Sequence, residues 1–481
     1  MGTAKGLAKN SFWLMTGTGI SILVGTIYRP VIARMLDPDD FGRYTFITTF
    51  IGYFTILAYF GLRQVVVREV SRDRENARGY LAAALRIRTV TALAAMAACC
   101  AVGFLLSVDA NVKSGIAILS VSLAVAGLGE ILEGVLLAFG RSYFIALASL
   151  TGNLLKLVIG IWALKAGYGL LGVLTVFILT SAVSTVMDWW FVRSLLRTEK
   201  RPEAAPELRK TMLRESLPFV VLSAATRLYT KNDILFLTML RGVKATGLYG
   251  AAYTFVDLLM AIANSAVSAV YPVVAKMHTD AAGTLGDTYE RLHKYMLLLL
   301  LPISVLLMSL GGEVLVAVFG KDYLRGTPAL QVLVWTPPVE VSCLISGTFL
   351  CAMYRQRLDA TIASSMTALN VVATIGLIIL FGAMGAAVAT VGASMVNAML
   401  HYYYVRRVVG PVKTRNAWLK PMVCCGLMLA AVQVVSQSMP IVRLLTGILV
   451  YIAAIAVIRP FDVEDRRLFT SLVKRGGAAS G

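Results

Sequence analysis

Three polar residues recur at every fourth position of the apolar run 215–240: Ser223, Arg227 and Lys231. With 3.6 residues per turn, this spacing places them on one face of a helix. Arg227 lies about 18 Å along the helix axis from the start of the run, at 1.5 Å per residue. Two cations one turn apart repel each other, so an anion between them would be stabilising. Phosphate oxygens suit both the planar donors of arginine and the point charge of lysine, so this face predicts a phosphate site.

A similar polar face runs through the apolar stretch 11–33, where Thr18, Ser21, Gly25 and Arg29 follow helical spacing. Lys156 is a further cation inside an apolar run. An ionisable group inside a bilayer costs at least about 2.5–3.5 kcal/mol, so each should face a cavity or a partner. We therefore predict that Arg29, Lys156, Arg227 and Lys231 line one basic chamber that binds a substrate phosphate.

Four carboxylates in apolar runs are candidates for ion coupling: Glu130, Glu133, Glu340 and Asp257. Glu130 and Glu133 lie one turn apart and should perturb each other's ionisation, which suits a proton or cation site. A structural ion pair with Lys156 or Arg227 is an equally open alternative for them. No resident cofactor is expected beyond a possible coupled H⁺ or Na⁺.

Three more charged residues receive structural interpretations. Arg88 and Asp188 lie near the ends of their apolar runs, where a side chain can extend to the headgroup region. Asp233 follows Lys231 by two residues and lies on another face, so we expect a cation from a neighbouring helix to neutralise it.

The elements that position these residues are membrane-spanning helices. The chain has 481 residues, 58% hydrophobic and 15% charged, with a mean hydropathy of +0.76. Apolar runs of about 20 residues, the length that crosses a bilayer, recur from end to end. We predict an all-α integral membrane protein with about fourteen spans: 11–33, 43–62, 82–107, 115–139, 142–164, 168–192, 215–240, 247–272, 295–312, 326–352, 358–381, 384–405, 418–436 and 441–458. Pro337-Pro338 predicts a bend inside the tenth.

The basic residues predict the orientation. With a cytoplasmic N-terminus, 30 of the 45 Lys and Arg residues fall in cytoplasmic loops and tails, counting those at span ends with the adjacent loop. Nine fall on the opposite side. Because short cytoplasmic loops are enriched in Lys and Arg, both termini are predicted to be cytoplasmic, in the plasma or inner membrane.

The chain contains an internal repeat. Met35-Leu36 and Gly42-x-Tyr44 reappear as Met239-Leu240 and Gly247-x-Tyr249, at an offset of about 204 residues. Six helices per half is an even number, so both halves enter from the same side, as in parallel-repeat transporters. We predict an N-lobe over 1–194, a basic linker over 195–214, a C-lobe over 215–408, and two appended helices with a cytoplasmic tail over 409–481.

Several classes of chemistry lack their motifs. The sequence has no G-x-x-x-x-G-K-[ST] loop, no H-E-x-x-H helix and no G-x-S-x-G elbow, which argues for transport rather than covalent catalysis. The six cysteines all lie in predicted spans, without a C-x-x-C pair or histidines at ligand spacing. We therefore predict no metal site and no disulfide framework.

Longer stretches resemble a known family. They are Ala8-Lys9-Asn10-Ser11, the run from Ala33 to Tyr44 (ARMLDPDDFGRY), Tyr59-Phe60-Gly61-Leu62 before Arg68, Asn232-Asp233, Gly247-Leu248-Tyr249 with Ala251-Ala252-Tyr253, and Tyr271-Pro272. These resemble the polysaccharide-unit flippases of the multidrug/oligosaccharidyl-lipid/polysaccharide exporter superfamily. The resemblance implies two six-helix lobes with one or two extra helices, and export of lipid-linked oligosaccharide from the cytoplasmic leaflet.

The leading hypothesis is a flippase for a polyprenyl-(pyro)phosphate-linked oligosaccharide, with the bilayer as a partner, glycan-assembly proteins as candidate partners, and no nucleic acid. Four alternatives stay open: a drug or metabolite antiporter of the same superfamily, a peptidoglycan-precursor flippase, a membrane glycan polymerase or ligase, and a passive scaffold. An antiporter for cations fits a basic chamber poorly. A polymerase or ligase usually has a large extracytoplasmic loop, whereas no such loop here exceeds about fifteen residues.

Overall fold

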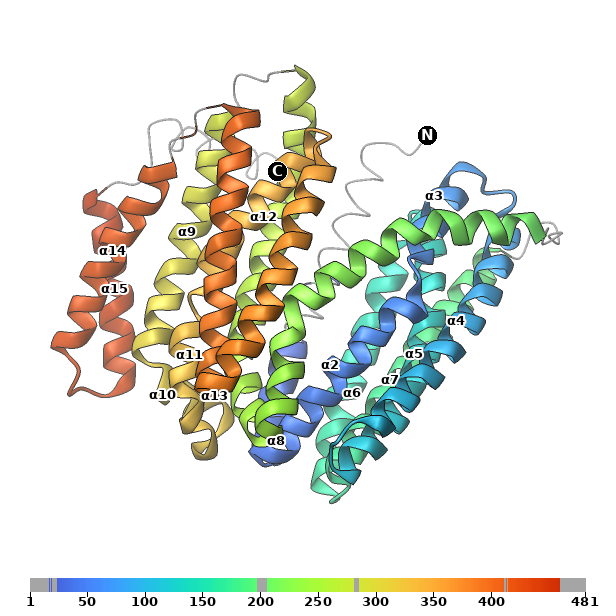
Figure 1. Ribbon diagram of the computed structural model, residues 1–481, viewed down its shortest axis with the longest axis horizontal. Coiled ribbons are helices and arrows are strands. Elements are labelled where there is room, and N and C mark those ends of the chain that lie inside the picture. Colours follow the sequence, from blue (N-terminus) through green and yellow to red (C-terminus); the bar gives the residue numbers. More distant parts are fainter. Residues whose placement is uncertain are drawn as a thin grey trace, which may run out of the picture.

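The computed structural model describes Gly17, Gly19 and residues 24–196, 206–280, 285–410, 412 and 414–458. Every regular element within these residues is a helix, which confirms the all-α prediction (Figure 1). Thr18 and Ser21, the middle of the linker and the tail after Ile458 lie outside the described residues.

The helices follow one another with short connections. Residues 24–35 are helical. The later elements are α2 (Pro38–Tyr59), α3 (Leu62–Arg72), α4 (Ala77–Leu105), α5 (Ala110–Ala138), α6 (Ser142–Lys165), α7 (Gly169–Leu195), α8 (Pro206–Asp280), α9 (Leu285–Ser309), α10 (Gly311–Phe319), the 3₁₀ turn η2 (Lys321–Gly326), α11 (Thr327–Leu333), α12 (Thr336–Ala352), α13 (Gln356–Val409), α14 (Thr414–Val434) and α15 (Pro440–Ile458).

Two long helices are each broken at a glycine. Gly242 in α8 has φ 82°, and Gly382 in α13 has φ 60°, a region that favours glycine because it has no Cβ. Both glycines lie in turns predicted between spans. Ten helices of the described residues are long and apolar enough to cross a membrane, and these two breaks divide two of them. The protein is therefore a multi-pass membrane protein, while the exact number of fourteen spans stays a prediction.

The tenth predicted span is bent, as Pro337-Pro338 indicates. The segment Lys321–Leu333 meets Thr336–Ala352 at 41°. The prolines lie in the first turn of α12, where a missing N–H costs no helical hydrogen bond. A new helix therefore begins at this point instead of continuing α11.

Local capping explains where α2 begins. The Asp37 carboxylate accepts a hydrogen bond from the Asp40 backbone N–H at 2.7 Å, and Pro38 occupies the first helical turn. A side-chain acceptor at this position satisfies an otherwise free donor of the helix, and proline is already in helical geometry there. The Asp-Pro-x-Asp sequence thus makes a sharp corner between the first helix and α2.

The helices form two groups that meet along α8 (Figure 1). Helices α2 to α7 lie on one side and α9 to α15 on the other, while α8 packs against both α2 and α13. The two groups converge at the end where α8 turns at Gly242 and diverge towards the end that carries α3. The lobe and linker boundaries given above stay a prediction.

Backbone contacts close the converging end. A Cβ on Gly42 of α2 would lie 1.9 Å from the Val243 carbonyl oxygen, and one on Gly247 would lie 1.9 Å from the Pro38 carbonyl oxygen. These two glycines are partners in the sequence repeat. The repeat thus lets α2 and the second part of α8 approach more closely than any larger residue would permit.

An aromatic cluster covers the same end. Phe41 packs 5.9 Å from the Tyr323 ring and 6.2 Å from the Phe319 ring, measured between centroids. The Tyr323 hydroxyl donates to the Ala33 carbonyl at 2.9 Å, and all three rings are buried. The first two helices are therefore sealed against the α10–η2 segment of the other group.

Candidate functional site

A cavity of about 580 Å³ lies where the first helix, α2 and α5 to α8 face one another. It extends along α2 from Phe41 to Tyr59, about 27 Å of helix at 1.5 Å per residue. Among the described residues, its lining includes four cations and one carboxylate: Arg29, Lys156, Arg227, Lys231 and Asp257. The fold thus brings together the four cations that the sequence singled out, from three helices: the first helix, α6 and α8.

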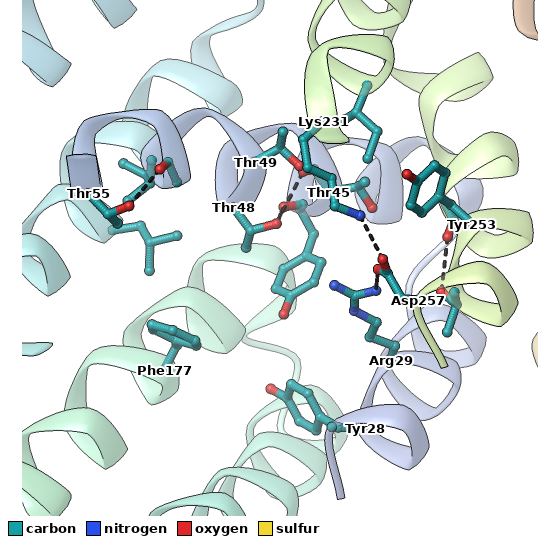
Figure 2. A pocket seen from close by; sticks show the side chains of 18 of the residues that line it. Tyr28, Arg29, Thr45, Thr48, Thr49, Thr55, Phe177, Lys231, Tyr253 and Asp257 are labelled. Carbon is teal, nitrogen blue, oxygen red and sulfur yellow. Dashed lines mark hydrogen bonds and ion pairs between the residues drawn. The ribbon is translucent and has the colours of Figure 1, made fainter. Parts of the chain in front are cut away.

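Asp257 bridges two of these cations (Figure 2). Its carboxylate oxygens lie 2.6 Å from Arg29 Nη1 and 2.8 Å from Lys231 Nζ. Asp257 was predicted as a coupling group, and the structure places it as the counter-ion inside the basic cavity. Arg29 and Asp257 remain partly exposed to the cavity, so an incoming anion can reach this pair.

Arg227 has no ion-pair partner among the described residues, and its Nε is buried without a hydrogen bond. Its guanidinium lies directly against Gly52 of α2, where a Cβ would fall 1.6 Å from Nη2. Lys231, one turn along, places its ammonium 3.9 Å from the centre of the Tyr253 ring. Arg227 is therefore a cavity cation that forms no ion pair with any carboxylate of the described part of the chain.

Lys156 of α6 is held by neutral groups. Its ammonium donates to the Asn153 amide oxygen at 2.9 Å and lies 5.4 Å and 5.6 Å from the Tyr28 and Phe177 ring centres. The electron-rich ring faces attract the cation without cancelling its charge. The cavity therefore has an excess of positive charge, with one carboxylate for four cations.

The sequence interpretation missed a threonine face on α2. Thr45, Thr48, Thr49 and Thr55 line the cavity beside Gly52, at the spacing of one helical face (Figure 2). The hydroxyls of Thr45 and Thr48 donate to Phe41 and Tyr44 carbonyls at 2.8 Å, which leaves their lone pairs towards the cavity side of the chain. The signal was present as a polar stripe in the predicted span 43–62.

The expectation that Arg88 extends to the headgroup region is wrong. Arg88 is fully buried, lies 2.6 Å from Glu130 and donates to the Ala58 carbonyl, and its guanidinium sits 5.0 Å from the Tyr59 ring centre. Glu130 therefore pairs with Arg88, neither with Lys156 nor with Arg227. Its partner comes from α4, a contact that only the packing of α4 on α5 creates.

Two further interpretations of acidic residues are also wrong. Glu133 pairs with Arg63 at 3.3 Å instead of with Lys156 or Arg227. Asp188 is only 2% exposed and does not reach the headgroup region. Glu130, Glu133 and Asp188 all line a second cavity inside the α2–α7 group, away from the central carboxylate.

The acids of the other group lie outside the central cavity. Glu340 accepts a hydrogen bond from the Tyr229 hydroxyl at 3.2 Å and does not line the cavity. Asp233 accepts from the Tyr249 hydroxyl at 2.5 Å and from its own neighbour's backbone N–H, with no ion pair among the described residues. The expected cation partner for Asp233 is thus wrong. Within the described residues, no group of His, Cys, Asp and Glu could hold a metal ion.

The chain belongs to a family of polysaccharide biosynthesis proteins, whose sequence model matches residues 7–278. Over 423 residues, 82% of each chain, it is 22% identical to the uncharacterized membrane protein EpsK of Bacillus subtilis (strain 168). It is 24% identical over 187 residues to a probable low-salt glycan biosynthesis flippase, Agl15, of Haloferax volcanii. That match spans 39% of this chain and 40% of the flippase.

Among solved structures, the fold is similar to that of the lipid II flippase MurJ in an inward closed conformation. The TM-score is 0.77 with 16% identity, over 92% of this chain and 98% of that chain. At this identity the likeness shows the fold alone. The two-group helical arrangement is thus shared with that flippase.

The Arg88–Glu130 pair generates a stability prediction. Arg88→Ala leaves the half-buried Glu130 carboxylate without its ion-pair partner, which should destabilise the protein by about 3–5 kcal/mol. Thermal unfolding of the purified protein in detergent measures the loss. Arg86→Ala, two residues away on α4 and exposed, is the matched control and should change stability by no more than about 0.5 kcal/mol. Equal unfolding temperatures for both variants would contradict the assigned role of Arg88.

Proposed function

We propose that the protein is a flippase for a polyprenyl-(pyro)phosphate-linked oligosaccharide, which it moves from the cytoplasmic to the outer leaflet by alternating access. The product would serve synthesis of a cell-surface polysaccharide or glycoconjugate. The observation that carries the proposal is the central cavity with four cations and one carboxylate. The family membership and the named flippase among its relatives support the same substrate class.

The cavity suits the head of such a lipid. A diphosphate brings negative charge to a site that has a surplus of positive charge. Arg29 and Arg227 supply planar donor pairs, while Lys231 and Lys156 supply mobile point charges. Binding of phosphate to Arg29 and Lys231 competes with Asp257, so the carboxylate acts as a resident counter-ion when no substrate is bound. The polyprenyl tail stays in the bilayer, because burying it elsewhere would need an apolar cavity of its own length.

A carrier for cationic drugs would need a cavity of the opposite charge. Here the one carboxylate among the described lining residues, Asp257, is already engaged by two cations. We further propose that the protein performs no covalent chemistry. A peptidoglycan-precursor flippase would also bind a diphosphate head, and analysis of accumulated lipids in a deletion strain separates these two substrates.

Removing cavity charge should stop transport. Arg227→Ala combined with Lys231→Ala, introduced into a strain deleted for the gene, is expected to leave lipid-linked oligosaccharide on the cytoplasmic leaflet, as the deletion does. Gly52→Ala should reduce export several-fold, because its new methyl group occupies the place of Arg227 Nη2. The measurement is the amount of lipid-linked oligosaccharide and of exported glycan.

The control for these variants is Gly25→Ala, since Gly25 lines the same cavity but has nothing within 4 Å of a new Cβ. It should export at the wild-type rate. Full export by the double variant, at normal levels of folded protein, would remove both residues from the site. Loss of the lipid intermediate itself in the deletion strain would instead point to an enzyme.

Coupling to entry of H⁺ or Na⁺ is part of the proposal, with Glu130, Glu133, Glu340 and Asp257 as its candidate groups. In reconstituted vesicles, an H⁺ or Na⁺ gradient directed inward should accelerate export. Glu340→Gln should remove that acceleration if Glu340 carries the ion, and Asp257→Asn if Asp257 does. An export rate that does not change with either gradient would exclude coupling to H⁺ or Na⁺.

We place both termini in the cytoplasm of a plasma or inner membrane, following the distribution of basic residues. The sealed end with Tyr323 then faces outward, and the α3–α4 connection faces the cytoplasm. A cysteine replacing the exposed Leu324 should react with a membrane-impermeant maleimide in intact cells, whereas one replacing the exposed Glu75 should not. The wild-type protein, with its six native cysteines, gives the background. The reverse labelling pattern would invert the topology.

A further inference from the structure

A second cavity of about 400 Å³ lies inside the α2–α7 group. Three helices each contribute one face of residues at positions i, i+3, i+4 and i+7. These are Ala126, Gly129, Glu130 and Glu133 of α5, Ser149, Gly152, Asn153 and Lys156 of α6, and Ser181, Ser184, Thr185 and Asp188 of α7. Because the lining residues follow regular helical spacing on all three helices, this cavity is a regular feature of the fold rather than a packing defect.

This second cavity, which we call the N-half pocket, adjoins the central cavity. Tyr59, Ala126, Lys156 and Phe177 line both spaces. A ligand whose charged group lies near Lys156 can therefore extend from one into the other. The volume of the N-half pocket lies within the range of about 300–1,000 Å³ that is usual for small-molecule sites. A single water molecule takes up only about 30 Å³, so the pocket is much larger than a bare cation needs.

Among the described residues, one carboxylate of the pocket has a buried oxygen without a hydrogen bond. Glu133 is paired with Arg63 at 3.3 Å and Glu130 with Arg88 at 2.6 Å. Asp188 is only 2% exposed, and its Oδ1 has no hydrogen bond. An unsatisfied buried carboxylate oxygen is costly, so a ligand that donates a hydrogen bond to it would be stabilised.

The α7 wall of the pocket presents acceptors rather than donors, whereas the two cations of the pocket, Arg63 and Lys156, lie on other walls and bind Glu133 and Asn153. The hydroxyl hydrogens of Ser181, Ser184 and Thr185 are directed to backbone carbonyls, of Phe177 at 2.8 Å, Ala148 at 3.1 Å and Val125 at 3.1 Å. Their lone pairs and the Asp188 carboxylate are left to accept hydrogen bonds. A phosphate, which only accepts, is disfavoured there. A sugar ring, which carries several hydroxyl donors, is favoured.

We propose that the N-half pocket is the subsite for the sugar next to the diphosphate, with Asp188 accepting a hydrogen bond from a sugar hydroxyl or amino group. The inference rests on the proposed function, since it divides one substrate between two cavities. The diphosphate lies among Arg29, Lys231 and Lys156, and the sugar passes the rings of Tyr59 and Phe177 into the pocket. Lys156, which lines both spaces, marks the junction.

The experiment compares two probes on the purified full-length protein: bare polyprenyl diphosphate, and the lipid-linked saccharides extracted from host cells deleted for the gene. Native mass spectrometry measures binding and identifies each bound lipid. Ser181→Trp fills the pocket, and Asp188→Ala removes the acceptor. Both should weaken binding of the saccharide lipids by at least about tenfold, the loss of one charged hydrogen bond. Both should leave binding of the bare diphosphate unchanged.

Val186→Trp is the matched control, because Val186 is 65% exposed on the same helix and lines neither cavity. It should bind both probes as the wild type does. Asp188→Asn keeps an acceptor oxygen and should lose less affinity than Asp188→Ala. Asp188→Ala also keeps the test open if the tryptophan variant does not fold, since no described residue donates a hydrogen bond to Asp188 Oδ1.

Two results would overturn the subsite. Equal loss for both probes would mean that the pocket does not distinguish sugar from phosphate. Unchanged saccharide binding, together with an export defect as severe for Asp188→Asn as for Asp188→Ala, would assign the pocket to an ion instead. If the wild-type protein binds neither probe, the proposed function itself fails, which is a separate outcome.

Discussion

The structure depends on how charge is compensated inside the thickness of a bilayer. A buried ion that loses water must gain a partner, and removing one partner of a buried pair costs several kcal/mol. Arg88 and Glu130 meet this requirement within one helical group, where they tie α4 to α5 and to the end of α2. Asp257 meets it between groups, because it joins Arg29 of the first helix to Lys231 of α8. The Arg88–Glu130 pair stabilises the α2–α7 group. The ion pairs of Asp257 with Arg29 and Lys231 lie where the two groups meet.

The central cavity departs from full compensation. Arg227 and Lys156 line it with support from a glycine, an amide and two aromatic rings, none of which cancels charge. Such residual positive charge attracts an anion, and Asp257, which pairs with Arg29 and Lys231, competes with that anion and favours its release. A carrier needs this balance, since a site that bound too tightly would not release its substrate on the far side.

The sealed end consists of contacts that can be broken and formed again. Gly42 and Gly247 bring backbones into contact without interlocking side chains, and the aromatic cluster adds apolar cover with one tyrosine hydrogen bond. These interactions are numerous but individually weak. They close one end of the cavity in this conformation together with an exposed ion pair at 3.9 Å between Lys244 of α8 and Asp39 of α2.

The sequence by itself determined that lipid surrounds most of the protein and that its fold is all-helical. It also determined the glycine and proline breaks and the four cations of the cavity. These follow from local physics: apolar run length, helical periodicity, backbone freedom and the cost of burying charge. Only the tertiary structure decided which groups pair with the buried charged side chains. Arg88 and Asp188 were assigned wrongly because linear distance from the end of a span does not measure depth in a bundle. Asp233 was assigned wrongly because α8 folds back and supplies the Tyr249 hydroxyl in place of a cation. The pocket around Asp188 likewise exists only because faces of three helices converge.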